Sequence, residues 1–93
     1  MTTIVLRLYI AGKTATAERA IDNLRKITAE LEEGDQQVDV EVVDILEQPQ
    51  LAEDERILAT PVVIKKLPPP LRRIVGDLSE LDKVLIGLDL KER

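Results

Sequence analysis

The chain has 93 residues, a formal net charge of −5 and 44% hydrophobic residues, which suits one small domain with a packed core. It contains no cysteine, histidine, tryptophan or phenylalanine, and these absences exclude disulfides, thiolate-ligated metals and the commonest general base. We therefore expect no enzyme, no cofactor and no metal site, and the acidic balance with Tyr9 as sole aromatic argues against nucleic acid or a membrane as partner.

The N-terminal half of the chain begins with an apolar strand and a long helix. Residues 4–10, IVLRLYI, are apolar on both faces and predict a strand in the centre of a sheet. A helix follows, with Thr14 or Thr16 as N-cap and with Gly34 predicted to end it in a left-handed conformation. Its apolar stripe has helical spacing and consists of Ala17, Ala20, Ile21, Leu24, Ile27, Thr28 and Leu31.

A second strand is predicted where Val38, Val40 and Val42 alternate with acidic residues, which indicates one wet face. Strand, helix and strand form a βαβ unit whose connection is long enough for a parallel pair. Residues 12–14 look like the end of a phosphate-binding loop, but no earlier glycine stands at the required spacing. We interpret them as a turn between strand and helix.

The second half is divided by prolines. Pro49 is predicted to begin a short helix, and residues 61–64 and 71–76 are predicted to form a strand hairpin. Residues 65–70 form the stiff turn between them. That turn contains three successive prolines, Pro68, Pro69 and Pro70.

The C-terminal segment satisfies two periods with the same residues. Asp77 and Glu80 form a capping-box pattern, and the leucines that follow predict a helix over residues 78–86. Residues 84–90 also alternate with period two, as a strand does. Such a double pattern is found in rare chains that have two packings of similar free energy.

Five segments resemble the KaiB family of small circadian clock proteins: residues 8–12, 44–53, 57–61, 67–79 and 83–90. The most specific of them joins the three prolines to Arg72-Arg73 and to Gly76-Asp77-Leu78-Ser79. The resemblance implies one domain over residues 1–93 with an α/β, thioredoxin-like fold in the order β-α-β-α-β-β-α. It also implies a metamorphic chain that exchanges this fold with an oligomeric ground-state fold.

The same resemblance implies a non-enzymatic regulator of a clock, timer or stress system. Its partner would be a KaiC-like ATPase, bound through a rearranged C-terminal half, with a signalling histidine kinase as competitor and self-association to a dimer or tetramer. An alternative is a thioredoxin-like sensor or adaptor that keeps a single fold. We expect a cytoplasmic location, since the chain has no cysteine and its N-terminus lacks a basic export signal.

Two groups of site residues are implied by the family. The fold-switch positions are Thr60, Pro61, Pro68, Pro69, Pro70, Gly87 and Asp89. Among them, Pro61 matches a proline that is often cis in thioredoxin-like folds, Gly87 weakens a helix and Asp89 weakens a strand. The candidates for the partner surface are Arg19, Arg56, Lys65, Lys66, Arg72 and Arg73.

The chain also departs from its relatives. Residues 12–15 stand where thioredoxins carry their cysteine pair, so thiol–disulfide exchange is excluded. The carboxylates Asp44, Asp77 and Asp89 form no recognisable acid–base cluster, and we expect them in turns or caps. The sequence ends at Arg93, where clock-type members continue into an acidic tail, so we expect a divergent or non-cyanobacterial member of the family.

Overall fold

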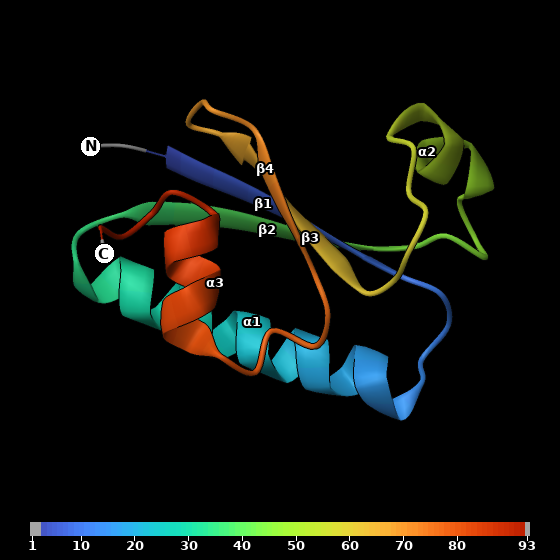
Figure 1. The fold of residues 1–93 in the computed structure, drawn as a ribbon, viewed down its shortest axis with the longest axis horizontal. Coiled ribbons are helices and arrows are strands. Elements are labelled where there is room, and N and C mark those ends of the chain that lie inside the picture. Colours follow the sequence, from blue (N-terminus) through green and yellow to red (C-terminus); the bar gives the residue numbers. More distant parts are fainter. Residues whose placement is uncertain (1–2, 93) are drawn as a thin grey trace.

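The computed structural model describes residues 3–92, which form a four-stranded sheet and three helices (Figure 1). The elements in chain order are β1 (Thr3–Ile10), α1 (Ala15–Glu33), β2 (Gln37–Asp44), α2 (Pro49–Asp54), β3 (Val62–Leu67), β4 (Arg72–Val75) and α3 (Leu81–Gly87). The predicted order β-α-β-α-β-β-α is confirmed.

The sheet has the strand order β2-β1-β3-β4. β1 pairs in parallel with β2 and antiparallel with β3, and β3 pairs antiparallel with β4. The predicted central position of β1 is therefore confirmed. α1 and α3 lie on one face of the sheet, whereas α2 lies on the other side, beyond the end of β2 (Figure 1).

The main core lies between the sheet and the helices α1 and α3. Leu24 and Ile27 of α1 are almost fully buried there against Leu6 and Leu8 of β1. Each such side chain contributes about 1.5–3 kcal/mol when it leaves water. The opposite face has a smaller core, in which Tyr9, Val43, Val62 and Ile64 pack against the half-buried Ile45, Leu51 and Ile57. That face of β1 is thus covered at one end only.

The ends of α1 show one correct and one wrong prediction. Thr14 is the N-cap, because its hydroxyl accepts a hydrogen bond of 3.1 Å from the amide of Ala17. Gly34 follows the helix with an ordinary φ of −90°, and Asp35 is the residue with the left-handed φ of 62°. The prediction for Gly34 is wrong, since aspartate also tolerates this conformation and lies one residue further along.

β2 is more exposed than its sequence pattern predicts. Val40 and Val42 are 41% and 42% exposed, although they stand on the apolar side of the alternation. The reason is position: β2 is an edge strand, and α1 covers it only in part. Val43, on the other face, is fully buried in the smaller core.

The predicted hairpin is present, but its first strand is longer than expected. β3 continues to Leu67, so Lys65 and Lys66 are strand residues and not turn residues as predicted. The Thr60–Pro61 peptide bond is cis, as the family resemblance implies. The Leu67–Pro68 and Pro69–Pro70 bonds are cis as well.

The C-terminal segment is helical in this structure, but its predicted start is wrong. α3 begins at Leu81, and the N-cap residue Glu80 makes no side-chain cap hydrogen bond, so the predicted capping box is absent. Asp77 instead accepts a hydrogen bond of 3.1 Å from the amide of Ser79. Leu78 takes a left-handed φ of 64° and is buried ahead of the helix.

Candidate partner-binding face of the sheet

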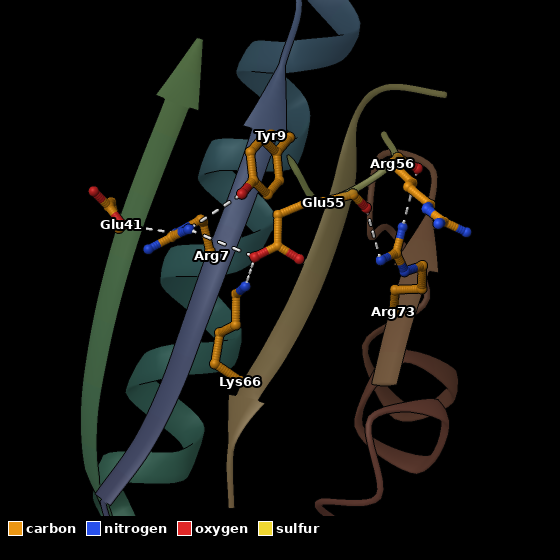
Figure 2. A network of polar contacts seen from close by, with 7 residues as sticks. All are labelled: Arg7, Tyr9, Glu41, Glu55, Arg56, Lys66 and Arg73. Atoms are coloured by element: carbon orange, nitrogen blue, oxygen red, sulfur yellow. Dashed lines mark hydrogen bonds and ion pairs between the residues drawn. The ribbon is translucent and has the colours of Figure 1, made fainter. Parts of the chain in front are cut away.

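A group of charged side chains lies on the sheet face opposite α1 and α3, where β1, β2, β3, β4 and the end of α2 meet (Figure 2). We call it the charged network, and its members are Arg7, Tyr9, Glu41, Glu55, Lys66 and Arg73. Arg7 lies at its centre and donates hydrogen bonds to the Glu41 carboxylate at 2.8 Å and to the Tyr9 hydroxyl at 3.2 Å. Neighbouring strands are thereby linked across their surface.

Glu55, just after α2, connects this helix to the sheet. Its carboxylate accepts a hydrogen bond from the Lys66 ammonium, and a guanidinium nitrogen of Arg7 lies 3.9 Å away. Arg73 donates to the main-chain carbonyl of Glu55 at 3.1 Å and to that of Arg56 at 3.5 Å (Figure 2). The end of α2 is therefore attached to β1, β3 and β4 by polar contacts.

The charged network has more cations than carboxylates, although the chain as a whole is acidic. Burial lowers the pKa of Lys66, and the positive charges of Arg7 and Arg73 lower it further. The hydrogen bond with Tyr9, together with the charge of Glu41, raises the pKa of Arg7. Three cations thus face two carboxylates in the network, and Arg56 adds a fourth positive charge beside it.

A shallow hollow of ≈ 180 Å³ lies next to the charged network. Arg56, Leu58, Ala59, Val62, Arg73 and Val75 line it. Leu58 is 96% exposed and Val75 60% exposed, so two large apolar side chains face water beside two arginines. We call these four residues, Arg56, Leu58, Arg73 and Val75, the α2 rim. A surface of this kind suits a partner segment that is both acidic and apolar.

The structure brings together only some of the predicted partner-surface cations. Arg56, Lys66 and Arg73 lie in or beside the charged network. Arg72, one residue from Arg73 in β4, points to the opposite face of the sheet because side chains alternate along a strand. Lys65 is only 1% exposed, and its prediction as a surface residue is wrong for this fold. The cause is the longer β3, which turns Lys65 toward the helices.

Arg19 is remote from the network and belongs to an internal contact. Its guanidinium lies 3.4 Å from the Asp77 carboxylate, and the Asn23 side chain donates to the Asp77 carbonyl at 2.8 Å. Hydrogen bonds from Ser79, and then the contact with Arg19, lower the pKa of Asp77. These bonds attach the segment before α3 to α1. Asp77 is thus a turn residue, as the sequence predicts.

The predicted fold-switch positions lie at three junctions of the second half and do not meet. Thr60 and Pro61 precede β3, and Pro68, Pro69 and Pro70 form the turn between β3 and β4. Gly87 ends α3, where an added Cβ would lie 2.5 Å from Cδ1 of Ile74 in β4. Asp89 follows with a left-handed φ of 59°. Their shared feature is that each bounds an element of the C-terminal half.

The sequence interpretation missed Arg7, Glu55 and Leu58. Arg7 carries a signal, since it is the single charge in an otherwise apolar strand. Glu55 carries none, because it is one of several acidic residues around a short helix. Only the tertiary fold brings it to Arg7 and Lys66.

The described residues, 3–92, contain no group of three or more acidic side chains placed to hold a metal ion, and no helix among them is long and apolar enough to cross a membrane. Asp44 accepts hydrogen bonds of 3.0 Å from the amides of Gly12 and Leu46, which is the turn role expected for it.

Comparison with known proteins decides the family. A model of the KaiB domain matches residues 7–90. The chain belongs to the KaiB family. The circadian clock protein KaiB3 of a Synechocystis species is 54% identical over 90 residues, which cover 97% of this chain and 86% of that protein. The circadian clock oscillator protein KaiB of Microcystis aeruginosa is 55% identical over 89 residues, which cover 95% and 83%.

Solved structures confirm the predicted thioredoxin-like fold for this KaiB-family chain. The N-terminal domain of SasA from Synechococcus elongatus superposes with a TM-score of 0.77 at 22% identity, covering 100% of this chain and 90% of that one. Chloroplastic thioredoxin z gives a TM-score of 0.72 at 18% identity, with 97% and 81% covered. At these identities the likeness establishes the fold alone.

Proposed function

We propose that this chain is a cytoplasmic, non-enzymatic regulator of a Kai-type clock, timer or stress system, which acts as a single domain and binds a KaiC-like ATPase in its thioredoxin-like form. The family supports a regulatory role in a circadian clock. The observation that carries the proposal is the α2 rim, where exposed Leu58 and Val75 stand beside Arg56 and Arg73.

The rim has the charge and the apolar surface that a specific, regulated contact requires. Among the described residues, Arg56 and Arg73 form no ion pair with a carboxylate, so both are available to an acidic partner. Leu58 and Val75 supply the apolar contact area, which a charge pair alone lacks. Arg72 points to the other face of the sheet and lies outside this surface.

The regulation that we propose uses the second half of the chain. The alternative ground-state fold repacks β3, β4 and α3 in a dimer or tetramer, and the monomeric thioredoxin-like form binds the ATPase. Thr60, Pro61, Pro68, Pro69, Pro70, Gly87 and Asp89 are the proposed switch positions, since each bounds an element of this half. A signalling histidine kinase with a similar binding surface would compete for the same ATPase.

Binding to a KaiC-like ATPase from the same organism tests the proposal directly. Arg73→Glu reverses a charge in the α2 rim and is expected to weaken binding by at least about tenfold, as for a central arginine of an interface. The matched control is Arg25→Glu, because Arg25 is exposed on the outer side of α1 and, among residues 3–92, its ion pair is with Asp22. Absence of binding by both the wild type and Gly87→Ala would contradict the proposal.

One observation favours an alternative, a thioredoxin-like sensor or adaptor with one constant fold: the single chain already has the thioredoxin-like fold. The two alternatives differ in their NMR spectra. A switching chain gives two sets of amide resonances in slow exchange whose ratio depends on protein concentration, because the oligomer is favoured at high concentration. A constant adaptor gives one set at every concentration.

A further inference from the structure

The site between Arg7 and Lys66 is a carboxylate-binding site, and in the free chain Glu55 occupies it. Arg7 and Lys66 come from neighbouring strands and converge on the Glu55 carboxylate (Figure 2). The side chains of Arg7, Lys66 and Glu55 are each about a quarter exposed. The site is therefore partly buried but still open to water on one side. A carboxylate from another molecule can therefore reach the same position if Glu55 leaves it.

Arg7 and Lys66 would attract such a carboxylate, because positive charge is concentrated around them. Arg73 has its charge beside the site, and within the described part of the chain its hydrogen bonds there are to the main-chain carbonyls of Glu55 and Arg56. Burial lowers the pKa of Lys66, and the nearby positive charges of Arg7 and Arg73 lower it further. The network holds three cations and two carboxylates, those of Glu41 and Glu55.

The helix that holds Glu55 in place is weakly attached. None of the residues of α2 is buried. The apolar contacts of this region with the sheet come from the half-buried Leu51 in α2 and from Ile57, which follows the helix. Movement of residues 55–56 away from the sheet would therefore expose Arg7 and Lys66.

We propose that Glu55 is an internal competitor for the partner: it fills the carboxylate site of Arg7 and Lys66 in the free chain, and a glutamate or aspartate of an acidic partner segment replaces it on binding. This inference rests on the proposed function in one respect, because the partner would reach the same face as the α2 rim. Glu55 would then reduce the affinity of the free chain for its partner, since a tethered carboxylate is present at high effective concentration.

The test measures binding of a fluorescein-labelled oligoglutamate peptide by anisotropy at low salt. Glu55→Gln removes the competing charge and is expected to tighten binding by about fivefold, the factor for one half-buried ion pair. Glu53→Gln is the matched control, since it makes the same charge change at an exposed position two residues earlier, in α2. It is expected to change binding by less than about twofold, the effect of net charge alone.

A further variant keeps the test decisive if Glu55→Gln perturbs the fold, which circular dichroism would reveal. Lys66→Met in the wild type removes one of the two cations of the site and is expected to weaken peptide binding. Added to the Glu55→Gln variant, it is expected to abolish the tighter peptide binding of that variant. Equal tightening by Glu55→Gln and Glu53→Gln, or no effect of Lys66→Met, would overturn the inference.

The proposed function is tested separately with the ATPase. If the ATPase binds the wild type but the two glutamine variants bind the peptide equally, the competitor role is wrong and the proposed function stands. If the ATPase does not bind while Glu55→Gln alone tightens peptide binding, the competitor role stands and the proposed function fails.

Discussion

The closeness of Gly87 to Ile74 determines how the substitution Gly87→Ala, which adds a methyl group at the end of α3, changes the free energy of unfolding. A Cβ on residue 87 would lie 2.5 Å from Cδ1 of Ile74 and 3.5 Å from its Cγ1. Gly87→Ala gains about 0.5–1 kcal/mol from the helical backbone. Moving the end of the Ile74 side chain out of its rotamer costs a similar amount, about 0.5–1.5 kcal/mol. We therefore expect the single variant to stay within about 0.5 kcal/mol of the wild type.

Ile74→Val separates these two terms, because it removes Cδ1 and keeps the atom that makes the ordinary 3.5 Å contact. Ile74→Val alone should lower the free energy of unfolding by about 0.5–1.5 kcal/mol. In this background Gly87→Ala should restore about 1 kcal/mol, which gives a coupling energy of about 1 kcal/mol between the two sites.

Urea unfolding of the four proteins measures this coupling. Far-UV circular dichroism follows the helices, and fluorescence of Tyr9, the sole aromatic side chain, follows the opposite face of the sheet. Equal effects of Gly87→Ala in both backgrounds would refute the reasoning, since Ile74 would then place no restriction on residue 87.

Three further predictions concern the contacts that hold the helices. Asn23→Ala removes the hydrogen bond to the Asp77 carbonyl and should lower the free energy of unfolding by about 1 kcal/mol in urea, whereas Lys26→Ala on the exposed side of α1 should leave it nearly unchanged. Because the folded state lowers the pKa of Asp77, its contribution to stability is present above the unfolded-state pKa of about 3.9 and is lost as pH falls through the lower folded-state value. Asp77→Asn should accordingly flatten the acid side of a plot of urea midpoint against pH, and an unchanged slope would contradict this. Thr14→Ala should destabilise the chain by about 1 kcal/mol through loss of the N-cap, and Thr16→Ala, which keeps the cap, should cost clearly less in thermal unfolding.

The first half of the fold could be predicted from the sequence because its signals are local. The apolar run of β1 and the helical spacing of Leu24, Ile27 and Leu31 each point to one structure. Two details there differ from prediction. The left-handed residue is Asp35 and not Gly34, and Val40 and Val42 of the edge strand β2 are partly exposed.

The second half could be predicted only in outline, because its local signals conflict. The tail satisfies helical and strand periods together, and packing of Leu85 and Leu88 against the main core decides for the helix. Lys65 looks like a turn residue next to the prolines, yet β3 continues past it and buries it.

The candidate site depended on tertiary structure almost entirely. Arg7, Glu55 and Lys66 are far apart in the sequence, and their meeting follows from strand order and from the position of α2. The family resemblance indicated a set of candidate cations, but it could not say which of them share a face. Arg72 and Arg73 illustrate this, since adjacent strand residues point to opposite sides of the sheet.

Hydrogen–deuterium exchange of the chain, alone and saturated with a KaiC-like ATPase, tests the central claim most directly. If the α2 rim is the binding surface, the bound ATPase slows amide exchange in residues 55–60 and 72–75. Amide exchange on the outer side of α1 stays as it is in the free chain. No protection at saturating ATPase, or protection confined to α1, would contradict the claim.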